Sequence, residues 1–515
     1  MNTQSTVEQL RELKLPGMAK QYEAALEMPI HQQPDTHALI AMLADAELQH
    51  RRQTRTQLYL RLSKLRFHAL PEQVHTGAQR GLTKEQLLQL CDGQFIDRRN
   101  IERALVQVES NKGASGIDGM DTEQLRIYLN ANWKTLRTSI LQGNYVPSAV
   151  RKVEIPKPNG GKRMLGIPTV IDRMLQQAIA QWMQPKYDPL FSERSFGFRP
   201  GRNAHQAVLQ AQRYLAEGKV WVVELDLEKF FDKVNHDKLM SLLSKRIADK
   251  RTLKLIRNYL TSGIMEGGVV SPRTEGTPQG SPLSPLLSNI ILDELDKELE
   301  KRKHSFVRYA DDASIYVTSE AAAKRVMANV IRFIEVKLRL KVNREKTRIS
   351  KPYQSTLLGY SFGQTKDESW SVIIAKKSAD RVKEKCKMIT KRNNGLSEEM
   401  KIAKLAPIVR GWVNYFILAK ATKKMKELDS FVRTRLRMGK WKQWKTPKAR
   451  ERNLRALGGQ PHNVKRWANS SVGCCRLAQT PILKSTLSNN YYLKKGYIGF
   501  LNTYLRHNSK QPSLF

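Results

Sequence analysis

The sequence has few cysteines and no long apolar run. The four cysteines are Cys91, Cys386, Cys474 and Cys475, and none has C-x-x-C spacing, so neither a zinc site nor a disulfide framework is predicted. No apolar run approaches the ~20 residues that a membrane-spanning helix needs. The N-terminus is also too polar for a secretory signal. Together these absences predict a cytoplasmic protein that makes no use of a membrane.

Negative charge is scarce in this sequence. Asp and Glu number 48 against 89 Lys and Arg, which gives a net charge of +41 and a pI near 10.1. Self-repulsion of that size is usually kept because a polyanion neutralises it, and nucleic acid is favoured over an anionic membrane surface. Residues 371–515 hold 33 basic and 7 acidic residues, and therefore 26 of the 41 net charges. A solubilising surface would not concentrate one sign in this way.

Apolar residues recur at helical spacing through much of the chain. Residues 1–67 and 98–140 show three- and four-residue spacings, which predict helices. Asn235 precedes a further apolar pattern of this kind and is placed to open a helix. From residue 375 onward the pattern is helical, basic and rich in Trp and Tyr.

Strand-like segments lie between these helical stretches. Residues 150–156 and 162–168 flank a Pro-Asn-Gly turn sequence, which predicts a hairpin. Residues 219–231 alternate apolar and acidic side chains like a strand, and 305–317 read as a hairpin of two apolar runs joined by four residues. Strands interleaved with helices in this order predict an α+β domain.

Three aspartates carry the chemistry that this pattern suggests. Asp226 stands near the end of the apolar strand, and Asp311 and Asp312 stand at the tip of the second hairpin. Carboxylates in such places are unfavourable unless a cation lies between them, and a pair of Mg²⁺ ions would serve phosphoryl transfer. An isolated Asp-Asp pair is usually only a turn. Here the flanking apolar strands and the matching strand carboxylate favour a catalytic metal site.

An ordered series of motifs resembles the group II intron reverse transcriptases and maturases. Tyr309-Ala310-Asp311-Asp312 resembles the Y-x-D-D box of reverse transcriptases, and residues 223–226 resemble the strand that carries their first metal ligand. The likeness covers about residues 98–505, through IPKPNGGKRMLGIPTVIDR (155–173), FSERSFGFRPGRNAHQA (191–207), LDLEKFFDKVNHDKL (225–239), GTPQGSPLSPLLSNI (276–290), LKVNREKT (340–347), LLGYSF (357–362), APIVRGWVNYF (406–416) and RLRMGKWKQWKTPKAR (435–450).

The resemblance implies a right-hand polymerase fold and a set of site residues. Fingers and palm containing an antiparallel sheet would occupy 98–372, an α-helical thumb or maturase domain 373–460, and a basic nucleic-acid-binding region 461–515. A helical segment, 1–97, would precede them. Asp226, Asp311 and Asp312 would be the catalytic residues and the ligands of two Mg²⁺ ions.

The nucleotide-binding residues follow from the same resemblance. Lys157 and Arg163 would reach the triphosphate of the incoming nucleotide, which fits the need for cations where charge moves to pyrophosphate. Phe231 would pack under the sugar and exclude a 2′-hydroxyl, whereas its neighbour Phe230 is expected in the core. Gln279 would contact the nucleotide near its sugar.

The basic C-terminal region is predicted to bind RNA. Trp412, Tyr415, Trp441 and Trp444 are interleaved with cations, a composition suited to structured or single-stranded RNA. A Trp-rich helical core is an equally good reading of the tryptophans. The cations assigned to RNA are Arg410, Arg433, Arg435, Arg437, Lys442 and Lys445.

The sequence departs from the family pattern at both ends. After the maturase region no paired cysteines and histidines follow, so no target-strand endonuclease domain is expected. Residues 10–26, 46–67 and 81–96 resemble the helical start of the ATPase helper proteins of certain insertion sequences. The phosphate-binding motif G-x-x-x-x-G-K-[ST] of those ATPases is absent from the sequence. Residues 1–96 therefore suggest a helper segment without its ATPase site.

These observations favour an RNA-directed DNA polymerase that also acts as a maturase. Its expected partners are an RNA template, structured intron RNA, a DNA primer or target, and deoxynucleoside triphosphates, in a bacterial cytoplasm. One alternative is a related reverse transcriptase recruited for host DNA repair or defence. Another is a non-catalytic RNA-binding splicing factor whose polymerase site is vestigial.

Overall fold

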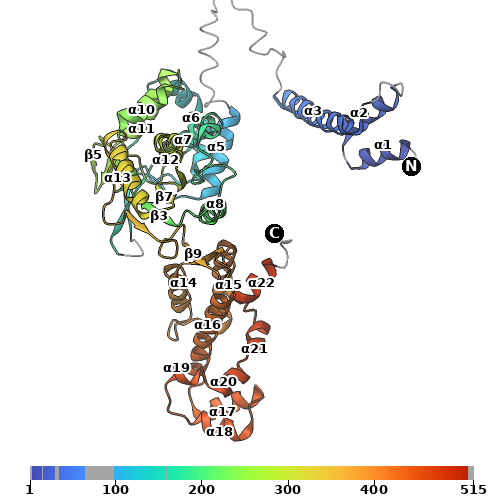
Figure 1. The fold of residues 1–515 in the computed structure, drawn as a ribbon, viewed down its shortest axis with the longest axis vertical. Helices are drawn as coiled ribbons and strands as arrows, with labels where there is room; N and C mark the ends of the chain where they lie inside the picture. The colour runs from blue at the N-terminus through green and yellow to red at the C-terminus, as the bar shows by residue number, and fades with distance from the viewer. Residues whose placement is uncertain (1–2, 14, 29–33, 64–97, 157–159, 509–515) are drawn as a thin grey trace, which may run out of the picture. The chain divides into compact units, whose positions relative to one another are not determined.

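Two compact units make up the chain, and they divide after residue 92 (Figure 1). The computed structural model describes residues 3–13, 15–28, 34–63, 98–156 and 160–508. Within these ranges, no helix combines the length and the apolar composition needed to cross a membrane.

The first unit is helical. It contains α1 (Thr3–Glu12), α2 (Pro16–Leu26) and α3 (Thr36–Ser63). Glu47 on α3 is 6% exposed, and its carboxylate accepts hydrogen bonds from the backbone N–H groups of Gly17 (2.8 Å) and Met18 (3.2 Å) at the start of α2. A carboxylate at a helix N-terminus satisfies donors that the helix itself leaves unpaired. The predicted helices of residues 1–67 are confirmed as far as Ser63, and the remainder lies outside the described residues.

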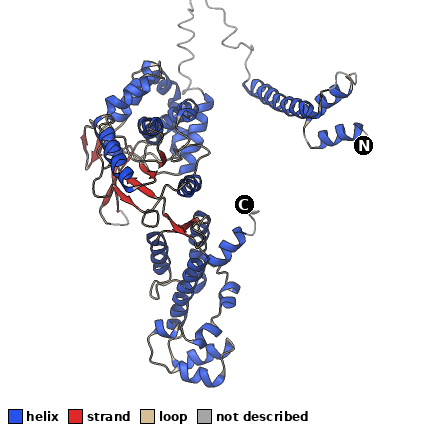
Figure 2. Ribbon diagram, viewed as in Figure 1, coloured by secondary structure: helices blue, strands red, loops and turns tan. Residues whose placement is uncertain are grey.

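The second unit begins with helices, and two small sheets lie beside the helices of this part (Figure 2). Its predicted helices over 98–140 are present, and Asn235 caps a helix as expected by accepting the Lys238 N–H at 2.9 Å. The helices are α5 (Arg98–Asn111), α6 (Gln124–Leu141), α7 (Val170–Tyr187), α8 (Ala204–Ala216), α9 (Phe230–Lys233), α10 (His236–Ser244), α11 (Lys250–Thr261), α12 (Ser284–Lys301) and α13 (Glu320–Val336), with a 3₁₀ turn, η5, at Asp188–Leu190.

Two four-stranded sheets carry the predicted hairpins. The first has the order β2-β1-β4-β5, and the second has the order β6-β7-β3-β8 with antiparallel neighbours throughout. Their strands are β1 (Val150–Pro156), β2 (Lys162–Ile167), β3 (Trp221–Leu225), β4 (Ile264–Glu266), β5 (Val269–Ser271), β6 (Ser305–Tyr309), β7 (Asp312–Val317) and β8 (Arg348–Ser350). The β1–β2 hairpin and the α+β class are confirmed.

Two details of the second sheet differ from the prediction. The strand predicted over 219–231 ends at Leu225, because α9 begins at Phe230. The hairpin connection predicted as four residues is only two, because Tyr309 and Asp312 pair directly and leave Ala310 and Asp311 as the turn. Ala310 has a φ of 58°, the left-handed conformation that tight hairpin turns require.

Each face of the second sheet belongs to a different hydrophobic core. Val223 and Ile315 pack into a core formed with the preceding helices. Val222 and Tyr316, the neighbours of Val223 and Ile315 on the two strands, pack into a core shared with the C-terminal helices. This division follows from the two-residue alternation of side chains along a strand. The sheet is therefore buried on both faces. Polar side chains are found where its strands end, near Asp226 and Asp311.

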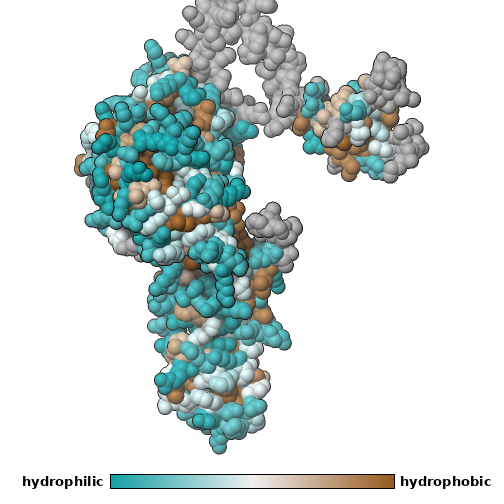
Figure 3. Space-filling model, in the orientation of Figure 1, coloured by the Kyte–Doolittle hydropathy of each residue, from teal (hydrophilic) through white to brown (hydrophobic). Residues whose placement is uncertain are grey.

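The C-terminal part of the second unit is helical after one further hairpin, as predicted from residue 375 onward. Figure 3 shows mostly hydrophilic side chains on the visible face of these helices, consistent with the concentration of basic residues there. The elements are β9 (Tyr360–Gln364), β10 (Trp370–Ile374), α14 (Lys376–Ile389), α15 (Glu398–Tyr415), α16 (Thr422–Gln443), α17 (Pro447–Ala456), α18 (Pro461–Ala468), α19 (Cys474–Leu477), α20 (Pro481–Thr486), α21 (Asn489–Lys494) and α22 (Phe500–Asn508).

Candidate active site and basic surface

The register of the second sheet brings the three aspartates together. Leu225 pairs with Ala313 at the end of the β3–β7 ladder, so Asp226 stands one residue beyond it, opposite Asp312. Cross-strand neighbours point to the same face of a sheet. Asp311 is the second residue of the turn, and Asp312 follows it as the first residue of β7. The structure thus places the three predicted carboxylates at one corner of the sheet.

The pKa values of Asp311 and Asp312 are raised at this corner. The pKa of Asp311 is raised by burial and also by the charge of Asp226. The pKa of Asp312 is raised to about 6, by burial and then by repulsion from Asp311 and Asp226. Asp312 is exposed as a whole residue, so a cation from solvent can reach its carboxylate. A cation at this corner would therefore stabilise the ionised forms of Asp311 and Asp312.

Lys346 supplies one positive charge at this corner. Its Nζ lies 3.2 Å from Oδ2 of Asp226. The backbone of Asp226 is held as well, because its N–H donates to Oγ1 of Thr347 at 3.2 Å and its carbonyl accepts the N–H of Asn343 at 2.9 Å. The segment 343–347 therefore holds Asp226 from the β8 side of the strand, opposite the turn.

A buried ion pair holds the turn that carries Asp311. Arg308 is 1% exposed, and its guanidinium bonds the carboxylate of Asp296 on α12, which has no exposed surface, at 2.6 to 3.0 Å. The same guanidinium donates to Oδ1 of Asn289 and to the carbonyl of Ala310, both at 2.9 Å. A buried pair is favourable only when its hydrogen-bonding capacity is filled, as it is here.

Sequence reasoning missed this network. Arg308 directly precedes the Y-x-D-D box and could have been noticed on that ground. Nothing in the sequence pattern connects it with Asp296 or Asn289, because those contacts depend on how α12 packs beneath the hairpin.

The turn also rests on the segment 194–197. The N–H of Arg308 donates to the carbonyl of Arg194, and the N–H of Phe196 donates to the carbonyl of Arg308, both at 2.9 Å. Gly197 lies so close to the turn that a Cβ there would be 2.2 Å from the backbone nitrogen of Ala310. A glycine is therefore required at this position. The predicted motif at 191–207 is thus packed directly against the aspartate turn.

Arg163 and Gln279 meet on the first sheet. Arg163 on β2 is exposed, and its Nε donates to Oε1 of Gln279 at 2.7 Å. The charge of Arg163 lowers the pKa of Asp311, which opposes the larger effects of burial and repulsion. Two of the predicted nucleotide-binding residues are therefore in contact, and Arg163 lies close enough to act on Asp311. Lys157, predicted to act beside Arg163, lies outside the described residues.

Glycine allows a close approach next to Gln279. The carbonyl of Gln279 accepts the N–H of Gly166 at 2.9 Å. Gly280 has a φ of 112°, and a Cβ there would lie 3.2 Å from the carbonyl oxygen of Gly166. The Pro-Gln-Gly segment is therefore held against the β1–β2 hairpin by backbone contacts.

Phe231 lies on α9, five residues after Asp226. It is half-buried and meets Phe230 edge to face, with ring centroids 5.3 Å apart. Phe230 is 2% exposed, which confirms its expected place in the core. The backbone carbonyl of Phe231 accepts the N–H of Thr277 at 2.6 Å and so ties α9 to the segment that carries Gln279.

The cations predicted to bind RNA differ in accessibility. Arg410, Lys442 and Lys445 are exposed. Arg435 is half-buried and donates its Nε to Oγ1 of Thr390 at 3.2 Å. The remaining two are Arg433, which is half-buried, and Arg437, which is 5% exposed.

The tryptophans of this region pack in or against the C-terminal hydrophobic core. Trp441 is 3% exposed and Trp444 is 6% exposed, and both belong to the C-terminal hydrophobic core. Trp412 packs against the same core. Tyr415 is 37% exposed, but its hydroxyl donates to the carbonyl of Leu358 at 2.9 Å. For the tryptophans, the core reading is therefore the one that the structure supports.

The donor set at the aspartate corner fits a magnesium ion chemically. Within the described ranges, no group of three or more Asp, Glu, His or Cys side chains is closed about a common point. Carboxylate oxygens are nevertheless the ligands that Mg²⁺ prefers, and a cation would relieve the repulsion that raises the pKa of Asp311 and Asp312.

Three family models match the sequence. The model for reverse transcriptase (RNA-dependent DNA polymerase) matches residues 155–362, and the group II intron maturase-specific domain matches residues 379–458. The model for the IstB-like ATP binding protein matches residues 8–106, which confirms the N-terminal resemblance to insertion-sequence helpers. A reverse transcriptase domain implies binding of an RNA template and deoxynucleotides, and its family is consistent with divalent metal ions.

Relatives of known sequence extend the similarity. Protein YkfC of Escherichia coli is 34% identical over 280 residues, covering 47% of this chain and 74% of YkfC. The group II intron-encoded protein LtrA of Lactococcus lactis is 36% identical over 253 residues, covering 48% of this chain and 40% of LtrA. Among solved structures, a partial Cas6-RT-Cas1–Cas2 complex is similar over 50% of this chain and 45% of that chain, with 26% identity and a TM-score of 0.32.

Proposed function

Because this chain belongs to the group II intron family of reverse transcriptases with a maturase domain, we propose that it copies RNA into DNA and binds its intron RNA to assist splicing and mobility. The observation that carries the proposal is the meeting of Asp226, Asp311 and Asp312 at one corner of a sheet. The raised pKa values of Asp311 and Asp312 support a site that receives positive charge.

The proposed reaction is the extension of a DNA primer along an RNA template. The primer 3′-oxygen bonds to the α-phosphorus of a deoxynucleotide, the bond to the bridging oxygen breaks, and pyrophosphate leaves with the electron pair. Two Mg²⁺ ions, when held by the three aspartates, would lower the pKa of the 3′-hydroxyl and neutralise the departing pyrophosphate. Lys346 would keep Asp226 oriented through its 3.2 Å contact.

The protein's own side chains would bind and select the nucleotide. Arg163, with Lys157, would neutralise the triphosphate, because a guanidinium can pair with two phosphate oxygens at once. Gln279 would lie near the sugar, held in place by the 2.7 Å hydrogen bond that it accepts from Arg163. Phe231, half-buried on α9, would pack under the sugar and leave no room for a 2′-hydroxyl.

The parts of the chain would divide the work as in a right-hand polymerase. Residues 98–372 would form fingers and palm, 373–460 the thumb and maturase domain, and 461–515 a basic nucleic-acid-binding region. The concentration of positive charge after residue 371 supports RNA binding there. Residues 1–97 would be a helical docking segment related to transposition helpers.

Primer extension on an RNA template with deoxynucleotides and Mg²⁺ tests this proposal. Asp311→Asn should reduce DNA synthesis on the order of a thousandfold, because a metal ligand contributes several kcal/mol to such a reaction. RNA affinity should be unchanged. Asp367→Asn, an exposed position in the β9–β10 connection, is the matched control and should keep full synthesis.

Two results would argue against the assignment. Residual synthesis by Asp311→Asn comparable with the wild type would remove Asp311 from the site. No synthesis by the wild type, with tight RNA binding retained, would favour a non-catalytic splicing factor.

A further inference from the structure

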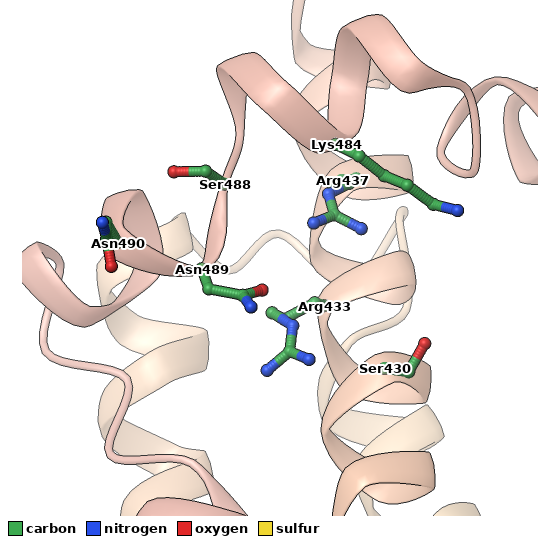
Figure 4. A pocket seen from close by; sticks show the side chains of 7 residues that line it. All are labelled: Ser430, Arg433, Arg437, Lys484, Ser488, Asn489 and Asn490. Carbon is green, nitrogen blue, oxygen red and sulfur yellow. The ribbon is translucent and has the colours of Figure 1, made fainter.

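A polar cavity of about 460 Å³ lies among the C-terminal helices, between α16 and the segment that joins α20 to α21. Figure 4 shows side chains of α16 on one side and of the facing segment on the other. Every lining residue is polar or positively charged, and none is acidic. They are Ser430, Arg433, Arg437, Lys484, Ser488, Asn489 and Asn490.

Two of the cations in this cavity, Arg433 and Arg437, lie close enough to repel each other. Arg433 and Arg437 are four residues apart on α16 and therefore lie on the same face of that helix. Arg437 is 5% exposed, and its Nε donates to the carbonyl of Leu487 at 3.0 Å. Burial, together with repulsion from Arg433, holds the pKa of the Arg437 guanidinium below its usual range. Like charges at this spacing are unfavourable unless an anion lies between them.

One acid, Asp429, offsets only part of the positive charge of Arg433, Arg437 and Lys484. Oδ2 of Asp429 lies 4.0 Å from Arg433, at the limit of an ion pair. Asp429 is 4% exposed, and its two oxygens accept hydrogen bonds from the hydroxyl of Tyr497 (2.8 Å) and the backbone N–H groups of Phe500 (2.8 Å) and Leu501 (2.9 Å). Its charge is therefore directed toward α22, and a net positive charge remains in the cavity.

The chemistry of the lining selects the ligand. The guanidinium groups of Arg433 and Arg437 and the amide groups of Asn489 and Asn490 offer many donors, which suits a tetrahedral oxyanion. The absence of an apolar lining side chain disfavours a hydrophobic ligand. The cavity volume of about 460 Å³ is many times the ~30 Å³ that one water molecule occupies. The cavity can therefore hold an oxyanion together with a neighbouring sugar.

We propose that this cavity binds a phosphodiester of the RNA backbone and fixes the RNA on the C-terminal helices. The inference rests on the proposed RNA binding by this chain and gives it a specific contact point. Free inorganic phosphate offers the same chemistry, and thermal unfolding in its presence separates the two sources. The RNA backbone is favoured because 26 net positive charges surround this region of the sequence.

Asn489→Asp is the sharpest variant, because it places a carboxylate in the cavity without changing the shape of the side chain. Folding should be preserved, since Asn489 is exposed and an acid in the first turn of α21 is favourable there. Asn393→Asp, exposed and outside the cavity, is its control. Lys484→Gln removes one cavity charge, and Lys465→Gln removes one exposed charge elsewhere.

The affinity for a fluorescent single-stranded RNA oligonucleotide is measured between about 50 and 200 mM salt. Asn489→Asp should weaken binding about tenfold more than Asn393→Asp, because it replaces a favourable phosphate contact with repulsion. Lys484→Gln should lower the slope of log affinity against log salt by about one, and Lys465→Gln should lower it less.

Thermal unfolding with and without inorganic phosphate distinguishes the source of the ligand. In one outcome, each cavity variant binds RNA as its control does, but phosphate raises the melting temperature of the wild type and not of Asn489→Asp. The site then takes free phosphate, and the RNA assignment is overturned. If the cavity variants match their controls in RNA binding and phosphate protects wild type and Asn489→Asp equally, the site itself is overturned. If the wild type binds no RNA but phosphate protects it through Asn489, the proposed RNA binding fails and the phosphate site stands.

Discussion

At the scale of single residues, the aspartate corner stores unfavourable electrostatic energy. Burial and the charge of Asp226 raise the pKa of Asp311, and burial with the charges of Asp311 and Asp226 raises the pKa of Asp312. Proteins retain such arrangements where a bound cation offsets the repulsion. Without the cation, the cost should appear as a dependence of stability on pH.

Asp312→Asn tests this cost in metal-free protein. The folded pKa of Asp312 is about 6, above its ordinary 3.8, so the folded state binds more protons than the unfolded state between these values. The free energy of unfolding therefore falls as pH rises from about 4 to about 6. At about pH 7 the variant should be more stable than the wild type by roughly 1 kcal/mol, after allowance for solvent screening.

Urea denaturation in the presence of a chelator measures this difference. At about pH 4 the advantage of Asp312→Asn should disappear, and Mg²⁺ at neutral pH should stabilise the wild type more than the variant. Asp367→Asn, which is exposed and remote in the β9–β10 connection, should show neither effect. Equal pH dependence in the wild type and Asp312→Asn would contradict the raised pKa.

At the scale of elements, the β6–β7 hairpin is positioned by its neighbours as much as by its own turn. Arg308 connects the carbonyl of Ala310 with Asp296 on α12. Gly197 closes the opposite side, in contact with the backbone of Ala310. The turn can therefore move only if α12 or the segment 194–197 moves with it. This explains how two adjacent acids are held in one place despite their repulsion.

Gly197→Ala should reduce DNA synthesis more than it reduces stability. The new Cβ would be 2.2 Å from the nitrogen of Ala310, so the turn carrying Asp311 must shift. Overpacking of this kind costs about 1–3 kcal/mol of stability, whereas a displacement of about 1 Å in a catalytic group lowers the rate about a hundredfold. Single-turnover primer extension and chemical denaturation measure the two effects.

Gly411→Ala is the matched control for this substitution. Gly411 lies within α15, and an added Cβ there meets nothing within 4 Å. The control should be as active as the wild type and slightly more stable, because alanine is the better helix former. A Gly197→Ala protein with wild-type synthesis would show that the turn tolerates movement.

At the scale of the whole molecule, the chain combines a helical first unit with a second unit that contains every proposed catalytic residue. The two hydrophobic cores of the second unit share one sheet, since Val223 faces one core and Val222 the other. The polymerase corner and the basic helices are therefore parts of one folded body. The first unit has its own internal contacts, such as those of Glu47 with the start of α2.

Removal of residues 1–97 should leave the polymerase intact. A protein of residues 98–515 should extend a primer within about threefold of the full chain, because independent units seldom depend on each other for folding. Primer extension and thermal unfolding of both proteins provide the test. A loss of synthesis together with a lower melting temperature would show that the first unit stabilises the second.

Much of the fold could be predicted because its signals are local. The first hairpin follows from two short strand-like runs around a turn sequence, the second from two apolar runs, and the helix after Asn235 from its capping side chain. The length of the connection before Asp312 could not be predicted, because the left-handed conformation of Ala310 depends on contacts with distant residues. The place of Trp441 and Trp444 was also undecided, since the same aromatic residues suit a core and an RNA-stacking surface.

The sequence by itself determined the family, the order of its motifs and the identity of the acids and cations, because these are properties of residues close together along the chain. Only the tertiary structure decided which of them meet. Arg163 reaches Gln279 across 116 residues, and Arg308 finds Asp296 on a helix packed beneath the hairpin. The cavity of Arg433 and Lys484 likewise exists only where α16 lies against α20. Such contacts depend on the packing of whole elements, which no short segment of sequence specifies.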